Sequence, residues 1–269
     1  VLAWGEGREG QLGSGKAHAR WDTPRVIPGL AGKQVASVSC GSAHSAAVTC
    51  SGEVYTWGRG FEGQLGHGSS KTQQDDPACQ ANGVQLTPRL VTHFLPAKKP
   101  KIAAAAIACG NNFTLVLGKG GEVWAFGEGG CGQLGSGRRT QSARPLLALA
   151  ASPETGGAMV AVAAGWAHAL ALSERGQVYA WGLNHVGQLG VGDTKARHTP
   201  TRTVFSASAE VAEIHALGGR SCALTRGGNV YAWGAVSSGG SSSSSSNAHP
   251  ATDVTAAVTT PHLVQALAG

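Results

Sequence analysis

The chain has 269 residues, of which 41 are Gly and 13% are charged, and its formal net charge is +6. This length can bury a large core, and the composition suits an all-β protein that is rich in turns. No run reaches the roughly 18 apolar residues that a membrane helix needs, and no signal peptide is recognisable. These observations exclude a membrane helix from this sequence. They predict an intracellular protein of the cytoplasm, the nucleus or both, without a membrane partner.

The first predicted element is the strand "VLAWG", and the loop after it contains "GEGREG" at residues 5–10. This G-x-G-x-x-G pattern recurs at 58–63 and 127–132, and it binds the pyrophosphate of NAD or FAD when it connects a strand to a helix. Each copy instead runs into Gly-Gln-Leu-Gly, where a helix would lose about 1 kcal/mol at every Gly. A fourth copy has Asn184 in place of Gly, and both residue types tolerate positive φ. We therefore interpret the loops as turns and predict that the protein has no cofactor.

An aromatic residue followed by Gly recurs five times along the chain. In the first four copies it stands seven positions before the Gln of Gly-Gln-Leu-Gly, a constancy typical of a structural repeat. The strand that ends in this aromatic residue, such as 54–57, is apolar on both faces, so both faces must be covered. We therefore assign structural roles to the aromatic residues and to the last Gly of the loop. These positions are Trp4, Trp57, Phe126, Trp181, Trp233, Gly66, Gly135 and Gly190.

Each repeat contains further strands around the aromatic one. A Gly turn five residues before the aromatic residue predicts a β-hairpin, and a run such as 35–50 holds two short apolar stretches separated by a Gly. A strand with Thr-Pro, as in "TPRVIPGL", is expected to open each repeat, which gives about four strands in each period. Four-stranded sheets that stack aromatic faces on small-residue faces form a β-propeller, and we predict this all-β fold. The predicted repeats are 1–22, 23–86, 87–143, 144–198 and 199–259, with a partial start at 260–269.

Two segments interrupt the repeats. Residues 69–86 form one insertion, and residues 237–259 form a low-complexity insertion in the copy that lacks Gly-Gln-Leu-Gly. The chain begins in the last strand of a repeat and stops after a first-strand element. We therefore expect a truncated propeller that exposes an apolar face at each end.

The run "CGSAHSAAVTCSGEVYTWGRGFEGQLGHG" resembles the repeat of the regulator of chromosome condensation family, in the β-lactamase-inhibitor-protein-II-like superfamily. It contains a Gly-x-x-His element, an apolar strand, a Gly turn, an aromatic-Gly pair and Gly-Gln-Leu-Gly. The resemblance covers nearly the whole chain and implies part of a seven-bladed propeller. The sequence departs from the pattern where Phe113 and Ser221 replace the His of the repeat and where Phe126 replaces Trp.

The sequence offers few candidates for chemistry. His44 and His168 occupy one repeat position in different blades, with Phe113 between them, so we assign them a structural, hydrogen-bonded role and not a catalytic or metal-binding one. The six Cys residues form no C-x-x-C pair. Cys40 and Cys109 share one strand position, so we expect small core residues and neither a zinc site nor disulfides.

No set of nucleophile, base and orienting residue is recognisable, so we predict a module that is not an enzyme and that binds protein partners through its loops. The resemblance also implies an alternative, a guanine-nucleotide exchange factor for a small GTPase of the Ran type, with chromatin as a further partner. The positive charges are mostly scattered, which makes them a weak signal for nucleic acid. A minor alternative rests on "GWAHA", which is similar to the G-W-R-H-T element of the family's plant UV-B photoreceptors. The candidate contact residues are Arg8, Arg59, Phe61, Asn184, His185 and Trp166.

Overall fold

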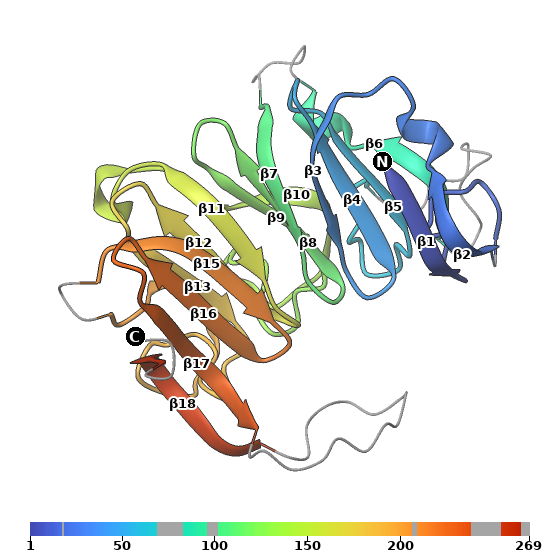
Figure 1. The fold of residues 1–269 in the computed structure, drawn as a ribbon. Coiled ribbons are helices and arrows are strands. Elements are labelled where there is room, and N and C mark those ends of the chain that lie inside the picture. Colours follow the sequence, from blue (N-terminus) through green and yellow to red (C-terminus); the bar gives the residue numbers. More distant parts are fainter. Residues whose placement is uncertain (18, 69–82, 96–101, 206–208, 238–253, 265–269) are drawn as a thin grey trace.

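The computed structural model describes residues 1–17, 19–68, 83–95, 102–205, 209–237 and 254–264 (Figure 1). These residues form sheets that lie side by side in an arc, with the N-terminal strands at one end and the C-terminal strands at the other. Each sheet is an antiparallel meander, because strands that follow one another in the sequence are hydrogen-bonded neighbours. The predicted all-β fold of propeller blades is confirmed.

The strands group into one two-stranded sheet and four four-stranded sheets within the described residues. The two-stranded sheet contains β1 (Leu2–Gly7) and β2 (Ala19–Val26). The first four-stranded sheet contains β3 (Val35–Cys40), β4 (His44–Thr49), β5 (Val54–Gly58) and β6 (Gln85–Leu90). The second contains β7 (Ala104–Cys109), β8 (Phe113–Gly118), β9 (Val123–Gly127) and β10 (Ser142–Leu149). The third contains β11 (Met159–Ala164), β12 (His168–Ser173), β13 (Val178–Gly182) and β14 (Arg197–Arg202). The fourth contains β15 (Val211–Leu217), β16 (Arg220–Thr225), β17 (Val230–Ser237) and β18 (Val254–Leu263). Short 3₁₀ helices, η1 (Pro28–Leu30), η3 (Thr92–Phe94) and η4 (Pro153–Thr155), connect neighbouring sheets.

The strand that contains Thr-Pro, or Arg-Pro in β10, lies at the outer edge of its sheet, and our expectation that it opens the repeat is wrong. It hydrogen-bonds to the aromatic strand that precedes it, as β6 does to β5 and β18 to β17. Proline cannot donate a main-chain hydrogen bond, so it fits an edge strand, and Pro88 and Pro261 lie in β6 and β18. Residues 260–263 therefore complete the fourth sheet and do not begin a new one.

The predicted insertions lie largely outside the described residues. Residues 69–82 and 238–253 are not described, whereas Gln85 begins β6 and Val254 begins β18. In the part of the chain that the structure describes, no helix is long and apolar enough to cross a membrane.

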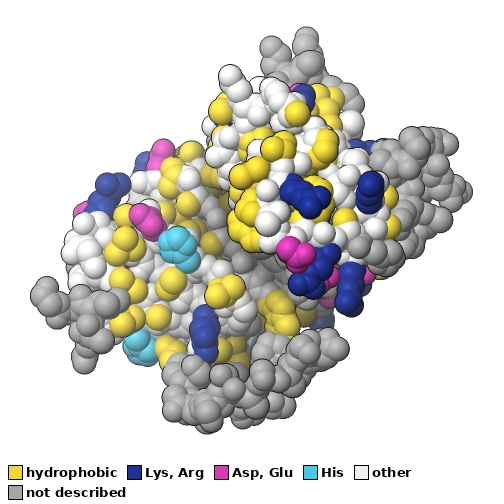
Figure 2. All heavy atoms as spheres, turned by 45° about the vertical axis from the view of Figure 1, so that its right-hand side comes forward, with side chains coloured by type: hydrophobic (Ala, Val, Ile, Leu, Met, Phe, Trp, Pro, Cys, Tyr) yellow, Lys and Arg dark blue, Asp and Glu magenta, His cyan; other side chains and the backbone are white. Residues whose placement is uncertain are grey.

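The repeated aromatic residues fill the spaces between neighbouring sheets, with one exception. Trp57, Phe126, Trp181 and Trp233 are buried as predicted, but Trp4 is 62% exposed. Trp4 occupies the same repeat position on β1, and no described sheet covers the outer side of β1 and β2. Figure 2 turns this end forward and shows hydrophobic side chains among Lys and Arg.

The two cysteines of the shared strand position also differ. Cys109 is buried, but Cys40 is exposed, so the prediction of a core residue is wrong for Cys40. Cys40 pairs with Ser45, whose hydroxyl donates to the main-chain carbonyl of Gln11 in the loop between β1 and β2. Cys40 therefore lies on the side of the two-stranded sheet, which has no inner strands to cover it.

Each of the four Gly-Gln-Leu-Gly loops forms a joint with the next sheet. The indole Nε1 of Trp57, Trp181 and Trp233 donates to the main-chain carbonyl of the loop Gln in the preceding sheet, at 2.8–2.9 Å. Phe126 has no such donor, and the hydroxyl of Thr114 donates instead to the carbonyl of Gln64 at 2.8 Å. The last Gly of the loop lies against the ring with positive φ, at Gly13, Gly66, Gly135 and Gly190. The repeated loop is thus explained by packing and turn geometry.

His44 and His168 connect neighbouring sheets from buried positions. Nε2 of His44 lies 3.0 Å from Oγ1 of Thr114 in the second sheet, and Nε2 of His168 lies 2.9 Å from Oγ of Ser221 in the fourth sheet. Each hydroxyl already donates to a loop carbonyl, so each His donates from Nε2. Each His therefore contributes one hydrogen bond between neighbouring sheets.

The fourth sheet departs from the predicted alignment by one residue. His44, Phe113 and His168 pair with the Gly after the aromatic residue, and in the fourth sheet Arg220 makes this pairing with Gly234. Ser221 instead corresponds to Ser45, Thr114 and Ala169, the neighbours that face the preceding sheet. The assignment of Ser221 to the His position is therefore wrong. Gly218 stands three residues before Ser221, as Gly41 does before His44, and this equal spacing led to the wrong alignment.

Candidate partner-binding face

One end of the sheets carries all the candidate contact residues. The turns between the first two strands of each sheet hydrogen-bond to the start of the loops that contain Gly-Gln-Leu-Gly. Examples are the bonds from Arg59 N–H to Ala43 and from Leu183 N–H to Ala167, both 2.8 Å. These turns and loops therefore lie at the same end, which we call the GQLG face. It consists of the turns 41–43, 110–112, 165–167 and 218–219 and the described parts of the loops 8–18, 59–84, 128–141 and 183–196.

A Gln side chain bridges the first turn of each loop on the GQLG face. In each loop, the Gln Oε1 accepts a hydrogen bond from the main-chain N–H two residues earlier, at 2.9–3.1 Å. These bonds link Gln11 to Glu9, Gln64 to Glu62, Gln133 to Cys131 and Gln188 to Val186. A loop that is already ordered loses little conformational entropy on binding, which favours partner contact.

Phe61 is a candidate anchor on this face. It is 48% exposed, and the Arg59 guanidinium lies 5.0 Å from its ring centre. Glu62 holds Arg59 in this position through a 2.9 Å ion pair, and Nε2 of Gln64 donates to the other Glu62 oxygen at 2.9 Å. Aromatic residues, Phe included, and Arg are both enriched at protein–protein interfaces. The sequence analysis did not single out Glu62, although opposite charges three residues apart in a turn indicate an ion pair.

The other loop candidates differ in accessibility. Arg8 and His185 are exposed, and Arg8 lies 3.7 Å from the Glu6 carboxylate. Asn184 is fully buried, so its prediction as a contact residue is wrong. Its amide donates to the carbonyls of Asp193 and Lys195 and accepts from Leu189 N–H, so it closes the loop from inside. Gly60, its counterpart in the first sheet, lacks a side chain that could make these bonds.

Trp166 is half-buried in the turn between β11 and β12. Its main chain belongs to a ladder that connects the turns of neighbouring sheets: Asn111 N–H donates to Trp166, and Trp166 N–H donates to Gly218. Ser42 begins this ladder by donating to Asn111. The equivalent position of the turn is occupied by Ser42, Asn111 and Gly218 in the other three four-stranded sheets, and by Trp only in the third.

The titratable groups with the largest pKa changes are sealed between sheets. Burial lowers the pKa of His44 and His168 from 6.5 to about 4 and raises the pKa of the Cys109 thiol to about 12. On the GQLG face, burial and the nearby Glu128 raise the pKa of Cys131, which disfavours the reactive thiolate. In the described residues, no three His, Cys, Asp or Glu side chains lie close enough to hold a metal ion.

A comparison with known protein families agrees with this repeated architecture of sheets and Gly-Gln-Leu-Gly joints. The RCC1-like domain model matches residues 1–269. This chain belongs to the RCC1-like domain family. The resemblance that the repeats indicated is thereby confirmed.

Two curated relatives show how widely RCC1-like chains are used. Human E3 ubiquitin-protein ligase HERC2 is 35% identical over 238 residues, which cover 75% of this chain and 5% of HERC2. The Arabidopsis thaliana ultraviolet-B receptor UVR8 is 37% identical over 237 residues, which cover 87% of this chain and 49% of UVR8. The RCC1-like chain thus spans at most about half the length of these two relatives.

Solved structures agree with the RCC1-like fold. Human WBSCR16 superposes with a TM-score of 0.77 and 21% identity, over 98% of this chain and 66% of that one. Yeast RCC1 (Prp20), bound to Kap60, superposes with a TM-score of 0.54 and 22% identity, over 98% of this chain and 71% of that one. At these identities the superpositions support the fold of the RCC1-like chain and not a particular activity.

Proposed function

We propose that this RCC1-like chain is a non-catalytic module that binds a protein partner through the GQLG face, with Phe61 as the central anchor. The observation that carries the proposal is the exposed Phe61 ring under the Arg59 guanidinium, which Glu62 and Gln64 hold in place. A side chain that is already fixed before binding loses less conformational entropy when a partner binds, which favours affinity. Arg8, His185 and Trp166 surround this anchor in our proposal as further contacts on the same face.

The experiment compares Phe61→Ala with the control Leu147→Ala. Leu147 has similar exposure, but it lies on β10, away from the GQLG loops. Proteins that co-purify with the chain are identified by mass spectrometry for the unchanged chain and for both variants. We expect Phe61→Ala to weaken a specific interaction by about tenfold or more, as hot-spot truncation does, and Leu147→Ala to leave it unchanged. Equal recovery of every partner by both variants would contradict the proposal.

Exchange of guanine nucleotide on a Ran-type GTPase is the second candidate function. It is supported by the fold of yeast Prp20p, whose structure was described together with its binding to Gsp1p and histones; the superposition has a TM-score of 0.55. A nucleotide-release assay with Ran and related GTPases tests it directly. Accelerated release by this chain would favour exchange over simple binding, and chromatin association belongs to the same candidate.

The photoreceptor alternative rests on the similarity of "GWAHA" to the G-W-R-H-T element. In the described turns, Trp166 shares its position with Ser42, Asn111 and Gly218, so the position does not repeat tryptophan. We therefore assign Trp166 to partner contact in our proposal.

A further inference from the structure

Two adjacent arginines, Arg138 and Arg139, lie exposed in the loop 128–141 of the GQLG face, which we call the arginine loop. Nε of Arg139 donates to the main-chain carbonyl of Gly130 at 3.0 Å, which ties this guanidinium to its own loop. Within the described part of the chain, no carboxylate forms an ion pair with either arginine. The loop's own carboxylate, Glu128, accepts instead from an amide of the neighbouring turn at 3.3 Å. The arginine loop therefore presents two positive charges that no ion pair neutralises.

The neighbouring sheets neutralise the arginines of this face internally. Arg59 of the first four-stranded sheet forms a 2.9 Å ion pair with Glu62, and Arg197 of the third forms a 2.8 Å ion pair with Asp193. In the arginine loop, Cys131 occupies the repeat position of Glu62. Arginine and carboxylate form strong, charge-assisted hydrogen bonds, and the two internal pairs show that a carboxylate fits a guanidinium on this face. The arginine loop offers the guanidinium groups without the carboxylate.

The arginine loop and the Phe61 anchor belong to one continuous surface. The loop that carries Phe61 rests on the start of β10, the strand that follows the arginine loop. Gly68 N–H donates to the Ala143 carbonyl at 2.8 Å, and a methyl group on Gly63 would lie 2.6 Å from Cα of Ala143. The next residue, Arg144, is exposed, and it too forms no ion pair with a described carboxylate. Positive charge therefore lies beside the loop that carries the exposed ring.

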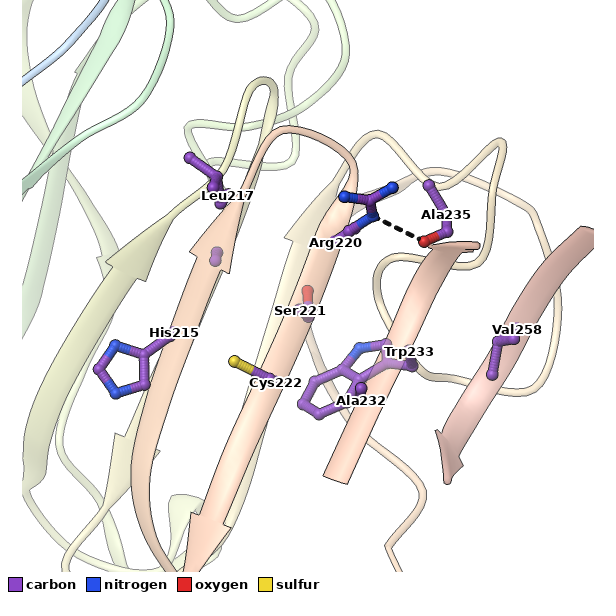
Figure 3. Close-up of a pocket in the computed structure, with 10 residues that line it drawn as sticks. His215, Leu217, Arg220, Ser221, Cys222, Ala232, Trp233, Ala235 and Val258 are labelled. Carbon is purple, nitrogen blue, oxygen red and sulfur yellow. Dashed lines mark hydrogen bonds between the residues drawn. The ribbon is translucent and has the colours of Figure 1, made fainter. Parts of the chain in front are cut away.

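The pattern of charge favours an acidic protein over a nucleic acid as the partner. A nucleic acid is bound by a stripe of positive charge along a surface. Here Arg59 and Arg197, in the sheets on either side of the arginine loop, are already paired with carboxylates. Arg220, whose Nε donates to the Ala235 carbonyl at 3.0 Å, belongs to the fourth sheet (Figure 3). The unpaired charge is therefore interrupted at the third sheet and forms a local patch.

We propose that the protein partner of the GQLG face binds through an acidic segment, in which two Asp or Glu side chains pair with Arg138 and Arg139 and an apolar side chain contacts Phe61. The partner's carboxylates supply what the neighbouring sheets supply from within, and opposite charge across the surface selects the partner and speeds its association. The proposal rests on the function proposed above and adds the chemistry of the partner to it.

The experiment selects peptides from a phage-displayed random dodecapeptide library on the immobilised 269-residue chain. The enriched peptides are synthesised, and their affinities are measured by fluorescence anisotropy. We expect a shared motif in which two acidic residues lie near an apolar one. The double variant Arg138→Glu with Arg139→Glu should weaken binding by about tenfold or more, because it places like charges together. A peptide with Lys in place of the acidic residues should bind this double variant more tightly than it binds the unchanged chain.

The control is Arg175→Glu, which reverses the charge of an exposed arginine in the turn between β12 and β13, at the opposite end of the sheets. It should bind the peptides as the unchanged chain does, and circular dichroism with unfolding midpoints checks that each variant is folded. A DNA duplex serves as the second probe. If it binds more tightly than the peptides and the double variant releases it, the partner is a nucleic acid and the proposal is overturned.

Peptides without acidic residues, or affinities that the double variant leaves unchanged, would also overturn the proposal. Phe61→Ala then separates the two levels of the argument. If Phe61→Ala still weakens binding, the GQLG face binds through Phe61 without an acidic segment, and the function proposed above stands. If Phe61→Ala changes nothing either, that function fails as well.

Discussion

Acid should destabilise the joint between the third and fourth sheets, because His168 cannot be protonated there without cost. The side chain is fully buried, its Nε2–H donates to Ser221, and its Nδ1 has no hydrogen-bond partner in the described structure. Burial lowers its pKa from 6.5 to about 4. Above pH 6.5 the residue is neutral in both folded and unfolded chains. Below pH 6.5 the unfolded chain binds the proton first, so stability falls until the pH reaches about 4.

The size of this effect follows from the two pKa values. The difference between 6.5 and about 4, at about 1.36 kcal/mol for each pH unit, gives a loss of about 3 kcal/mol. His44 has the same pKa of about 4 for the same reason, so the two residues together should make the chain strongly acid-sensitive.

The second and third sheets provide a matched replacement for this joint. Between these two sheets, Phe113 takes the place of His168 and Ala169 takes the place of Ser221, and both lie in one apolar cluster. The Gln133 carbonyl there accepts a hydrogen bond from the Trp181 indole alone, because Ala169 has no hydroxyl. The Trp233 indole donates to Gln188 in the same way, so the double variant His168→Phe with Ser221→Ala should keep every main-chain bond of the joint. Ser221→Ala alone should cost about 1–3 kcal/mol, because it leaves the buried His168 N–H without an acceptor.

Denaturant unfolding between pH 7 and pH 4, followed by circular dichroism, measures the difference. We expect the double variant to match the unchanged chain at pH 7 and to lose about 3 kcal/mol less on acidification. Taking the difference between the two proteins removes the contribution of every other titrating group that they share. An identical pH dependence for both proteins would show that burial of His168 does not cause the loss of stability in acid.

Two further predictions test the joints. Trp57→Ala and Trp181→Ala should each lower the free energy of unfolding by about 3–5 kcal/mol, because both side chains are buried between sheets. Trp4→Ala, at an exposed copy of the same position, should change it by about 0.5 kcal/mol. Comparable losses for all three variants would contradict the packing of these aromatic residues between neighbouring sheets. Thr114→Ala should cost at least about 1 kcal/mol more than Ser221→Ala, because it removes the donor to Gln64 as well as the acceptor for His44, and no indole replaces it. Adding Phe126→Trp should restore part of that loss in the same unfolding assay, and no recovery would argue against the carbonyl–indole joint.

The candidate face was only partly visible in the sequence. The spacing of the GQLG loops placed Arg59 and Phe61 in loops at one end of the repeats, and the structure has them there. Asn184 looked like any other polar loop residue, because a sequence pattern does not show which way a side chain turns. Its burial depends on the carbonyls of Asp193 and Lys195, which only the closed loop brings within reach.

The strands, the repeated aromatic positions and the Gly turns could be predicted from the sequence, because side-chain alternation and φ preference act within a few residues. The Thr-Pro strand lies at the edge because it hydrogen-bonds to the aromatic strand that precedes it. The sequence indicates this only through the proline, which lacks the N–H that a central strand would need. Trp4 and Trp181 carry the same local signal, yet one is 62% exposed and the other fully buried. Burial depends on whether a neighbouring sheet covers the position, and that neighbour is a property of the tertiary structure.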